Sequence, residues 1–129
     1  MKIHLVIAAI LLIPAACSAQ QKTTGNTGLK EQNSTDSTEY EITIMDSQFD
    51  YWYQTHYTRA MDRDNQTYRS YNRIGVMNWN DYFILGKHRN IIDEHLNYDY
   101  NIDYGIEVNR KLFWYFKYIQ EEYGIRLLY

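Results

Sequence analysis

An apolar stripe in the last third of the chain constrains the fold more than any other feature. Its residues step by four, four, three, four and four, which is the spacing of one face of an α-helix. They are Tyr104, Val108, Leu112, Tyr115, Ile119 and Tyr123. The stripe predicts a helix from about Tyr104 to about Glu122, with Gly124 as its C-terminal cap. Glu107 and Lys111 have the spacing of a favourable ion pair on its flank.

Two segments upstream predict two more helices. The first begins at a cap, Asp46 or Ser47. Its apolar face comprises Phe49, Trp52, Tyr53 and His56. The second runs from about Thr67 to about Asn80, although the run RIGVMNW inside it alternates in part and leaves a strand possible. Its stripe comprises Tyr68, Tyr71, Gly75, Trp79 and Tyr82. A mid-helix glycine costs about 1 kcal/mol relative to alanine, so we expect a close helix crossing at Gly75.

The run YEITIMD, Tyr40 to Asp46, predicts a short strand, because its β-branched and aromatic residues alternate with polar ones. Tyr40, Ile42 and Ile44 share one face. A strand needs a partner, and two segments are candidates, the region from Leu85 to Asn97 around NIID and the chain end IRLLY. The fold class expected is mainly α, of α+β type, with about three helices and one or two short strands in one small domain.

The first 16 residues have the pattern of a secretory signal peptide, in which one Lys precedes an apolar run that is too short to span a bilayer. The alternative is a buried N-terminal strand or helix, which the polar tract that follows disfavours. The only cysteine, Cys17, follows two alanines and resembles the lipobox of bacterial lipoproteins. That resemblance implies lipidation of Cys17 and removal of residues 1–16. Pro14 departs from the usual Leu of the motif, and cleavage after Ala19 would instead release a soluble periplasmic protein.

The polar tract after Cys17 predicts a tether. Residues 17–38 are rich in Ser, Thr, Gln, Asn and Gly and contain one large apolar residue, Leu29. Such a segment buries too little surface to offset its ordering entropy. All 14 Tyr, 3 Trp and 4 Phe fall within residues 39–129, which form the predicted globular domain. Its acidic residues outnumber its scattered basic ones, which argues against a nucleic-acid partner.

The stretch DYNIDYG resembles the start of an EF-hand calcium loop. Asp99, Asn101 and Asp103 have the spacing of its first three ligands, but Tyr104 stands at the glycine position and Arg110 at the closing glutamate. The interpretation we favour is that Asn101 or Asp103 caps the following helix and that no metal or other cofactor is bound.

A second polar cluster, GKHRNIIDEH, has no compact metal-binding or catalytic spacing. Its titratable residues are His88, Asp93, Glu94 and His95.

The side of the last helix opposite its stripe carries aromatic residues where charge is usual. Arg110, Trp114 and Tyr118 lie there, and Tyr98 and Tyr100 could extend the patch. One interpretation is a contact surface for a protein or glycan partner. The other is that segment 85–100 folds over these side chains and makes the helix central.

Three motifs carry a resemblance, namely YEITIMDSQFDYWY, YNRIGVMNWN and YNIDYGIEVN. They resemble a domain-of-unknown-function family of small Bacteroidota lipoproteins over about residues 40–127. The resemblance implies a location and a lineage but no activity, so it transfers no catalytic residue.

Two classes of function follow. The first is a non-enzymatic binding or structural module, tethered through Cys17 to the membrane of the cell envelope. Ser18 replaces the Asp that retains many lipoproteins at the inner membrane, so we expect the outer membrane, on the periplasmic side. The second is a small glycan- or peptidoglycan-acting enzyme with Asp99, Asp103 or Glu94 as acid and base.

Overall fold

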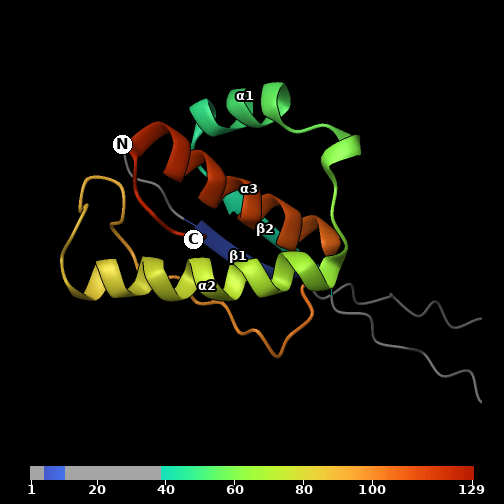
Figure 1. Cartoon of the computed structure of the whole chain (residues 1–129). Helices are drawn as coiled ribbons and strands as arrows, with labels where there is room; N and C mark the ends of the chain where they lie inside the picture. The colour runs from blue at the N-terminus through green and yellow to red at the C-terminus, as the bar shows by residue number, and fades with distance from the viewer. Residues whose placement is uncertain (1–4, 11–38) are drawn as a thin grey trace, which may run out of the picture.

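The computed structural model describes residues 5–10 and 39–129, and Figure 1 shows the arrangement of their elements. Cys17 and the predicted tether lie outside the described residues. Two strands and three α-helices follow one another along the chain, with a short 3₁₀ turn at Arg59–Met61. They are β1 (Leu5–Ile10), β2 (Glu39–Ile44), α1 (Ser47–His56), α2 (Asn65–Ile84) and α3 (Ile106–Tyr123). The predicted mainly α class, with about three helices and one or two strands, is confirmed.

Helix α3 is the centre of the domain. Figure 1 shows it between α1 and α2, with β2 behind it. Its buried residues cover most of its circumference and include both the predicted stripe and Trp114 and Tyr118. They are Val108, Asn109, Leu112, Phe113, Trp114, Tyr115, Phe116, Tyr118 and Ile119. A helix that is apolar all round has to be enclosed by other elements, and this one is enclosed by α1, α2 and β2.

Helices α2 and α3 cross closely at Gly75, as the sequence predicts. A Cβ placed on Gly75 would clash with Cδ2 of the Phe116 ring. The Phe116 ring is fully buried, with 0% of its surface exposed, so it has little room to move away. The absence of a side chain at Gly75 therefore sets the distance between the two helices.

Strand β2 has the predicted alternation, but its partner differs from both predicted ones. Ile42 and Ile44 are buried and Tyr40 is half-buried, whereas Glu41 and Thr43 are exposed. The partner is β1, which pairs antiparallel from Leu5 opposite Ile44 to Ile10 opposite Glu39. Both predicted partners form irregular structure, and removal of β1 with a leader peptide stays a prediction.

Helix α1 begins as predicted at an Asp46 cap, whose Oδ1 accepts the backbone N–H groups of Gln48 at 3.0 Å and Phe49 at 3.2 Å. The same helix corrects the expectation that segment 85–100 covers the far side of α3. Trp52 of α1 lies 6.1 Å from Trp114 and 5.5 Å from Tyr118, measured between ring centroids.

Segment 85–100 instead packs along α2. The Nε1–H of Trp79 donates to the Glu94 carbonyl at 2.8 Å. The Asn80 amide accepts the Leu96 N–H at 2.8 Å and donates to the Leu96 carbonyl at 3.0 Å, as a neighbouring strand would. Ile91 and Ile92 complete the contact as buried residues of the core.

Two local expectations at the start of α3 are wrong. The N-terminal cap is Gly105, which has no side chain to bind the helix, whereas Asp103 accepts the Gly105 N–H just before the helix at 2.9 Å. Glu107 pairs with Arg110 at 2.8 Å, one turn along the helix, and not with Lys111. The predicted C-terminal cap, Gly124, is confirmed and adopts the left-handed conformation with φ 66°.

We expect Gly75→Ala to destabilise the protein by about 1–3 kcal/mol, because overpacking against Phe116 outweighs the helix propensity gained by alanine. Urea unfolding followed by circular dichroism measures the change. The double variant Gly75→Ala, Phe116→Leu should show a coupling between the two sites, since the smaller side chain makes room for the new methyl group. Additive effects of the two substitutions would contradict the close crossing.

Candidate functional site

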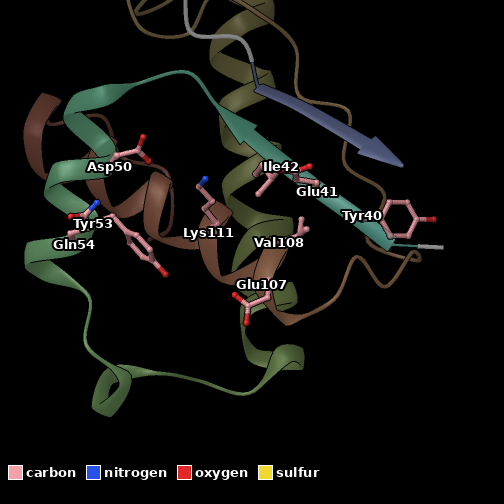
Figure 2. A pocket seen from close by; sticks show the side chains of 9 residues that line it. All are labelled: Tyr40, Glu41, Ile42, Asp50, Tyr53, Gln54, Glu107, Val108 and Lys111. Carbon is pink, nitrogen blue, oxygen red and sulfur yellow. The ribbon is translucent and has the colours of Figure 1, made fainter. Parts of the chain in front are cut away.

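A cleft of about 310 Å³ opens where β2, α1 and α3 meet. Figure 2 shows its lining side chains, with those of α3 lying between α1 and β2. They are Tyr40, Glu41 and Ile42 of β2, Asp50, Tyr53 and Gln54 of α1, and Glu107, Val108 and Lys111 of α3. The volume is at the lower end of the roughly 300–1,000 Å³ of small-ligand pockets.

The local structure of each element explains why these residues meet. Asp50, Tyr53 and Gln54 stand three and four residues apart, so they share one face of α1. Glu107 and Lys111 share a face of α3 by the same rule. The three elements are joined by the aromatic core beneath the cleft, where Phe49 lies 5.2 Å from Tyr115 between ring centroids. The cleft therefore has walls that are fixed by core packing.

The lining combines an apolar floor with a charged rim. Ile42 and Val108 are buried, with 5% and 3% of their surfaces exposed. Glu41, Asp50 and Glu107 are exposed carboxylates, and Lys111 is the one basic residue of the lining. One of the three carboxylates, Glu107, is already paired with Arg110. The rim thus favours a ligand that carries positive charge next to an apolar part.

Tyr53 is a half-buried polar residue of this lining. Burial, and after it the neighbouring Tyr57, raises the pKa of Tyr53 to about 12. The Tyr53 ring is held between Phe49, at 5.6 Å, and Tyr57, at 5.0 Å, between centroids. The phenol therefore stays protonated at neutral pH and offers a ligand a hydroxyl that can donate or accept a hydrogen bond.

A second hollow continues the cleft around the start of α3. It has a volume of about 400 Å³ and shares Tyr40 and Glu107 with the cleft. Its other lining residues are Glu39, Asp103, Tyr104, Gly105 and Ile106. The second hollow thus adds two further carboxylates, Glu39 and Asp103, beside those of the cleft.

The structure places the two central residues of the predicted aromatic patch in the core. Trp114 is 3% exposed and Tyr118 is 2% exposed, so neither offers a surface to a partner. The rings of Tyr53 and Tyr57 lie over Trp114, at 6.2 Å and 5.5 Å between centroids. The aromatic residues on this side of α3 indicated burial correctly, and the residues that bury them come from α1 and the segment after it.

Arg110 lies at the edge of the same cluster, but its guanidinium forms an ion pair with Asp62. Its Nη2 is 2.7 Å and its Nε 2.9 Å from the two carboxylate oxygens, a bidentate pair. The Tyr68 hydroxyl donates to the same carboxylate at 2.7 Å. These hydrogen bonds, with that of Arg110 first, hold the pKa of Asp62 well below its usual range. Arg110 therefore fixes the connection between α1 and α2 to α3.

Tyr98 and Tyr100 do not extend a patch around Trp114. The Tyr98 hydroxyl donates to Oδ1 of the fully buried Asn109 at 2.9 Å, and burial raises the pKa of Tyr98 to about 12. Tyr100 is half-buried, and the guanidinium groups of Arg69 and Arg73 each lie 5.2 Å from its ring centroid. Tyr98 thus fastens the loop before α3 to α3 itself, and Tyr100 fastens it to α2.

The side chains of the calcium-like stretch are engaged in hydrogen bonds with other groups of the chain. Asp99 accepts the Asn101 backbone N–H at 2.8 Å and its side-chain amide at 3.0 Å. Asp103 accepts the Asn65 amide at 2.9 Å, and this bond, with the Gly105 N–H, lowers the pKa of Asp103. In residues 5–10 and 39–129, no cluster of three or more His, Cys, Asp or Glu has an arrangement that could hold a metal ion.

The second polar cluster is spread over the surface of segment 85–100. The His88 ring lies edge-on to Tyr82 at 5.1 Å, and the His95 ring lies edge-on to Phe83 at 6.1 Å. Asp93 lines a separate hollow beside Phe83. The histidines thus pack against aromatic residues of α2.

Sequence reasoning missed the cleft altogether. Its residues come from three elements and form no motif, and their types are ordinary for exposed positions. The only available signal was that Tyr40 ends the strand stripe beside exposed carboxylates. It could predict a cleft only if β2 and α1 were already known to flank the start of α3.

The site and fold together define a small helical domain built around an aromatic helix, with one lined cleft beside a strand. None of the helices in the described residues is long and apolar enough to cross a lipid bilayer. The chain belongs to a family of unknown function, DUF6146, whose model matches residues 4–128. No curated protein and no solved structure matches the chain.

We expect Asp62→Asn to destabilise the protein at pH 7 by about 1–3 kcal/mol, because it breaks a charged hydrogen-bond network. Since the folded pKa of Asp62 is lowered, its contribution is complete above the unfolded pKa of about 3.9 and is lost as the pH falls below it. The difference in unfolding free energy between the variant and the native chain should therefore shrink from about pH 4 downward.

Urea unfolding at several pH values measures this difference. Asp81→Asn is the matched control, because Asp81 is an exposed carboxylate on α2, away from the network. A difference that stays constant between pH 7 and pH 3 would contradict the role given to the Asp62 charge.

Proposed function

We propose that this protein is a lipid-anchored binding module of the cell envelope and that the cleft between β2, α1 and α3 is its binding surface. The observation that carries the binding role is the composition of the cleft, an apolar floor under a rim of three carboxylates and one lysine. Such a surface suits recognition, because its apolar part supplies affinity and its charges supply selectivity.

The anchor is supported by the N-terminal sequence. An apolar run, two alanines and the single Cys17 follow the order of a lipoprotein signal. Two acyl chains on Cys17 would hold the protein stably at a bilayer, since each buried CH₂ contributes about 0.8 kcal/mol. Residues 18–38 would then serve as a tether between the outer membrane and the domain.

The surroundings of Asp103, one of the candidate acids, favour a binding role over a catalytic one. A glycan-cleaving acid needs a raised pKa so that it can hold a proton at neutral pH. Asp103 has a lowered pKa instead, because the Asn65 amide and the Gly105 N–H stabilise its charged form. Glu94 lies in segment 85–100, which packs along α2, and its carbonyl accepts the Trp79 N–H.

Cross-linking from the cleft tests the binding role. A photoreactive amino acid in place of the exposed Gln54 should give a defined adduct in intact cells, because Gln54 lines the cleft. The same amino acid in place of Asp81 is the control, since Asp81 lies on α2 outside the cleft. Adducts that form equally from both positions would contradict a specific surface at the cleft.

Metabolic labelling with a radioactive fatty acid tests the anchor. We expect label on the native chain and none on Cys17→Ala, because the thiol carries the acyl group. Cys17→Ser is a second control, since it preserves polarity but removes the thiol. The variants should also leave the membrane fraction. Absence of label on the native chain would overturn the anchor. Retention of the Cys17 variants in the membrane fraction would overturn it as well.

A further inference from the structure

We propose that the cleft is a strand-addition site, at which an extended peptide with a basic side chain pairs with the free edge of β2. This inference rests on the proposed function, because it names the class of partner that the cleft binds. Extended peptides commonly bind in this way, with main-chain hydrogen bonds for affinity and pockets for alternate side chains for selectivity.

The first step is that the edge of β2 opposite β1 is open, whether or not β1 is removed with the leader peptide. β1 occupies one edge along all of β2, from Glu39 to Ile44. The sheet in the described residues has two strands, so no strand occupies the other edge. Every second residue of β2 presents both its N–H and its C=O there. No other backbone hydrogen bond involves these groups within residues 5–10 and 39–129.

The second step is that the open edge faces a groove of suitable shape. In Figure 2, β1 lies on one side of β2, and the labelled side chains of α1 and α3 lie on the other. The cleft is thus bordered by β2 and α1 and has Val108 of α3 at its base. An added strand would lie between β2 and α1 and could direct alternate side chains toward the base and toward solvent.

The third step is charge. An added strand would pass Glu41 on β2, Asp50 on α1 and Glu107 on α3. Arg110 pairs with Glu107, and Lys111 is the one basic residue of the lining, so the rim keeps an excess of negative charge. The rim therefore attracts a lysine or arginine of the incoming strand and repels an acidic residue. Lys111 lowers this preference, so its removal should strengthen the binding of a basic peptide.

The probes are blocked octapeptides with Lys, Glu or Ser at the fourth position and Ser, Thr, Val or Tyr elsewhere. Fluorescence anisotropy measures their affinity for the purified full chain in detergent. We expect the lysine pool to bind at least tenfold more tightly than the glutamate pool. Methylation of alternate backbone nitrogens in the best lysine peptide should abolish binding, because it removes the ladder hydrogen bonds. Equal affinity of the three pools would overturn the proposal.

Variants of exposed residues locate the site without disturbing the core. Asp50→Asn should weaken the lysine peptide about two- to fivefold, and Lys111→Gln should strengthen it by a similar factor. Asp81→Asn, a carboxylate on α2, should have no effect. Amide exchange should slow at alternate residues of β2, those whose N–H groups face the cleft. Protection of the other alternate set would show pairing at the β1 edge and overturn the proposal.

The outcomes separate this inference from the proposed function. If no octapeptide binds but the cross-link at Gln54 still forms, the cleft binds a partner of another class, and the strand-addition proposal fails alone. If a lysine peptide binds with the expected charge dependence while no adduct forms in cells, the strand-addition site stands and the proposed cellular role fails.

Discussion

The enclosure of α3 is the constraint on which the rest of the structure depends. A helix with aromatic residues on every side cannot remain exposed, because each large ring would leave about 150–250 Å² in water. Tyr115, with 0% of its surface exposed, lies in contact distance of Phe49 on one side and Trp79 on the other. α1 and α2 are therefore held to α3 by ring packing, and their mutual position follows from it.

Asparagine side chains of α2 bind the backbone of the segments that pack against this helix. Asn72 donates to the carbonyl of Asn109 in the α2–α3 interface, and Asn80 binds the backbone of Leu96 as a strand would. Asn78 donates to the Leu127 carbonyl of the C-terminal segment at 2.6 Å. The amides of Asn78 and Asn80 satisfy backbone groups of irregular segments that would otherwise lack partners. The loops can thus contribute apolar residues to the core without forming strands.

The cleft is a consequence of the same packing. β2 and α1 both pack on α3, and only two residues separate them in the chain. With so short a connection, β2 and α1 cannot contact each other along their whole length. A recess remains at the start of α3, and its walls come from elements that the core already fixes. A partner that binds there would meet a surface with little ordering cost, which is the general basis of preorganised recognition.

The periodic features of the sequence were sufficient for the helices. The stripe from Tyr104, the Asp46 cap and the Gly124 cap predicted α3 and α1 within a few residues, because they act through local geometry. Gly75 predicted the close helix crossing for the same reason. Where the prediction depended on contacts between distant segments it went wrong, as with the partner of β2 and the cover of Trp114. Hydrophobic pattern marks a residue for burial but does not say which element buries it.

The sequence by itself therefore determined the three helices, strand β2, the Asp46 and Gly124 caps and most residues of the core. It also carries the lipoprotein-like signal at Cys17, which is a linear motif and needs no fold. Only the tertiary structure decided that Arg110 is held by Asp62, that β2 keeps one open edge and that Glu41, Asp50 and Glu107 share one cleft. These are relations between residues far apart in the chain, and they exist only after the packing around α3 has brought their elements together.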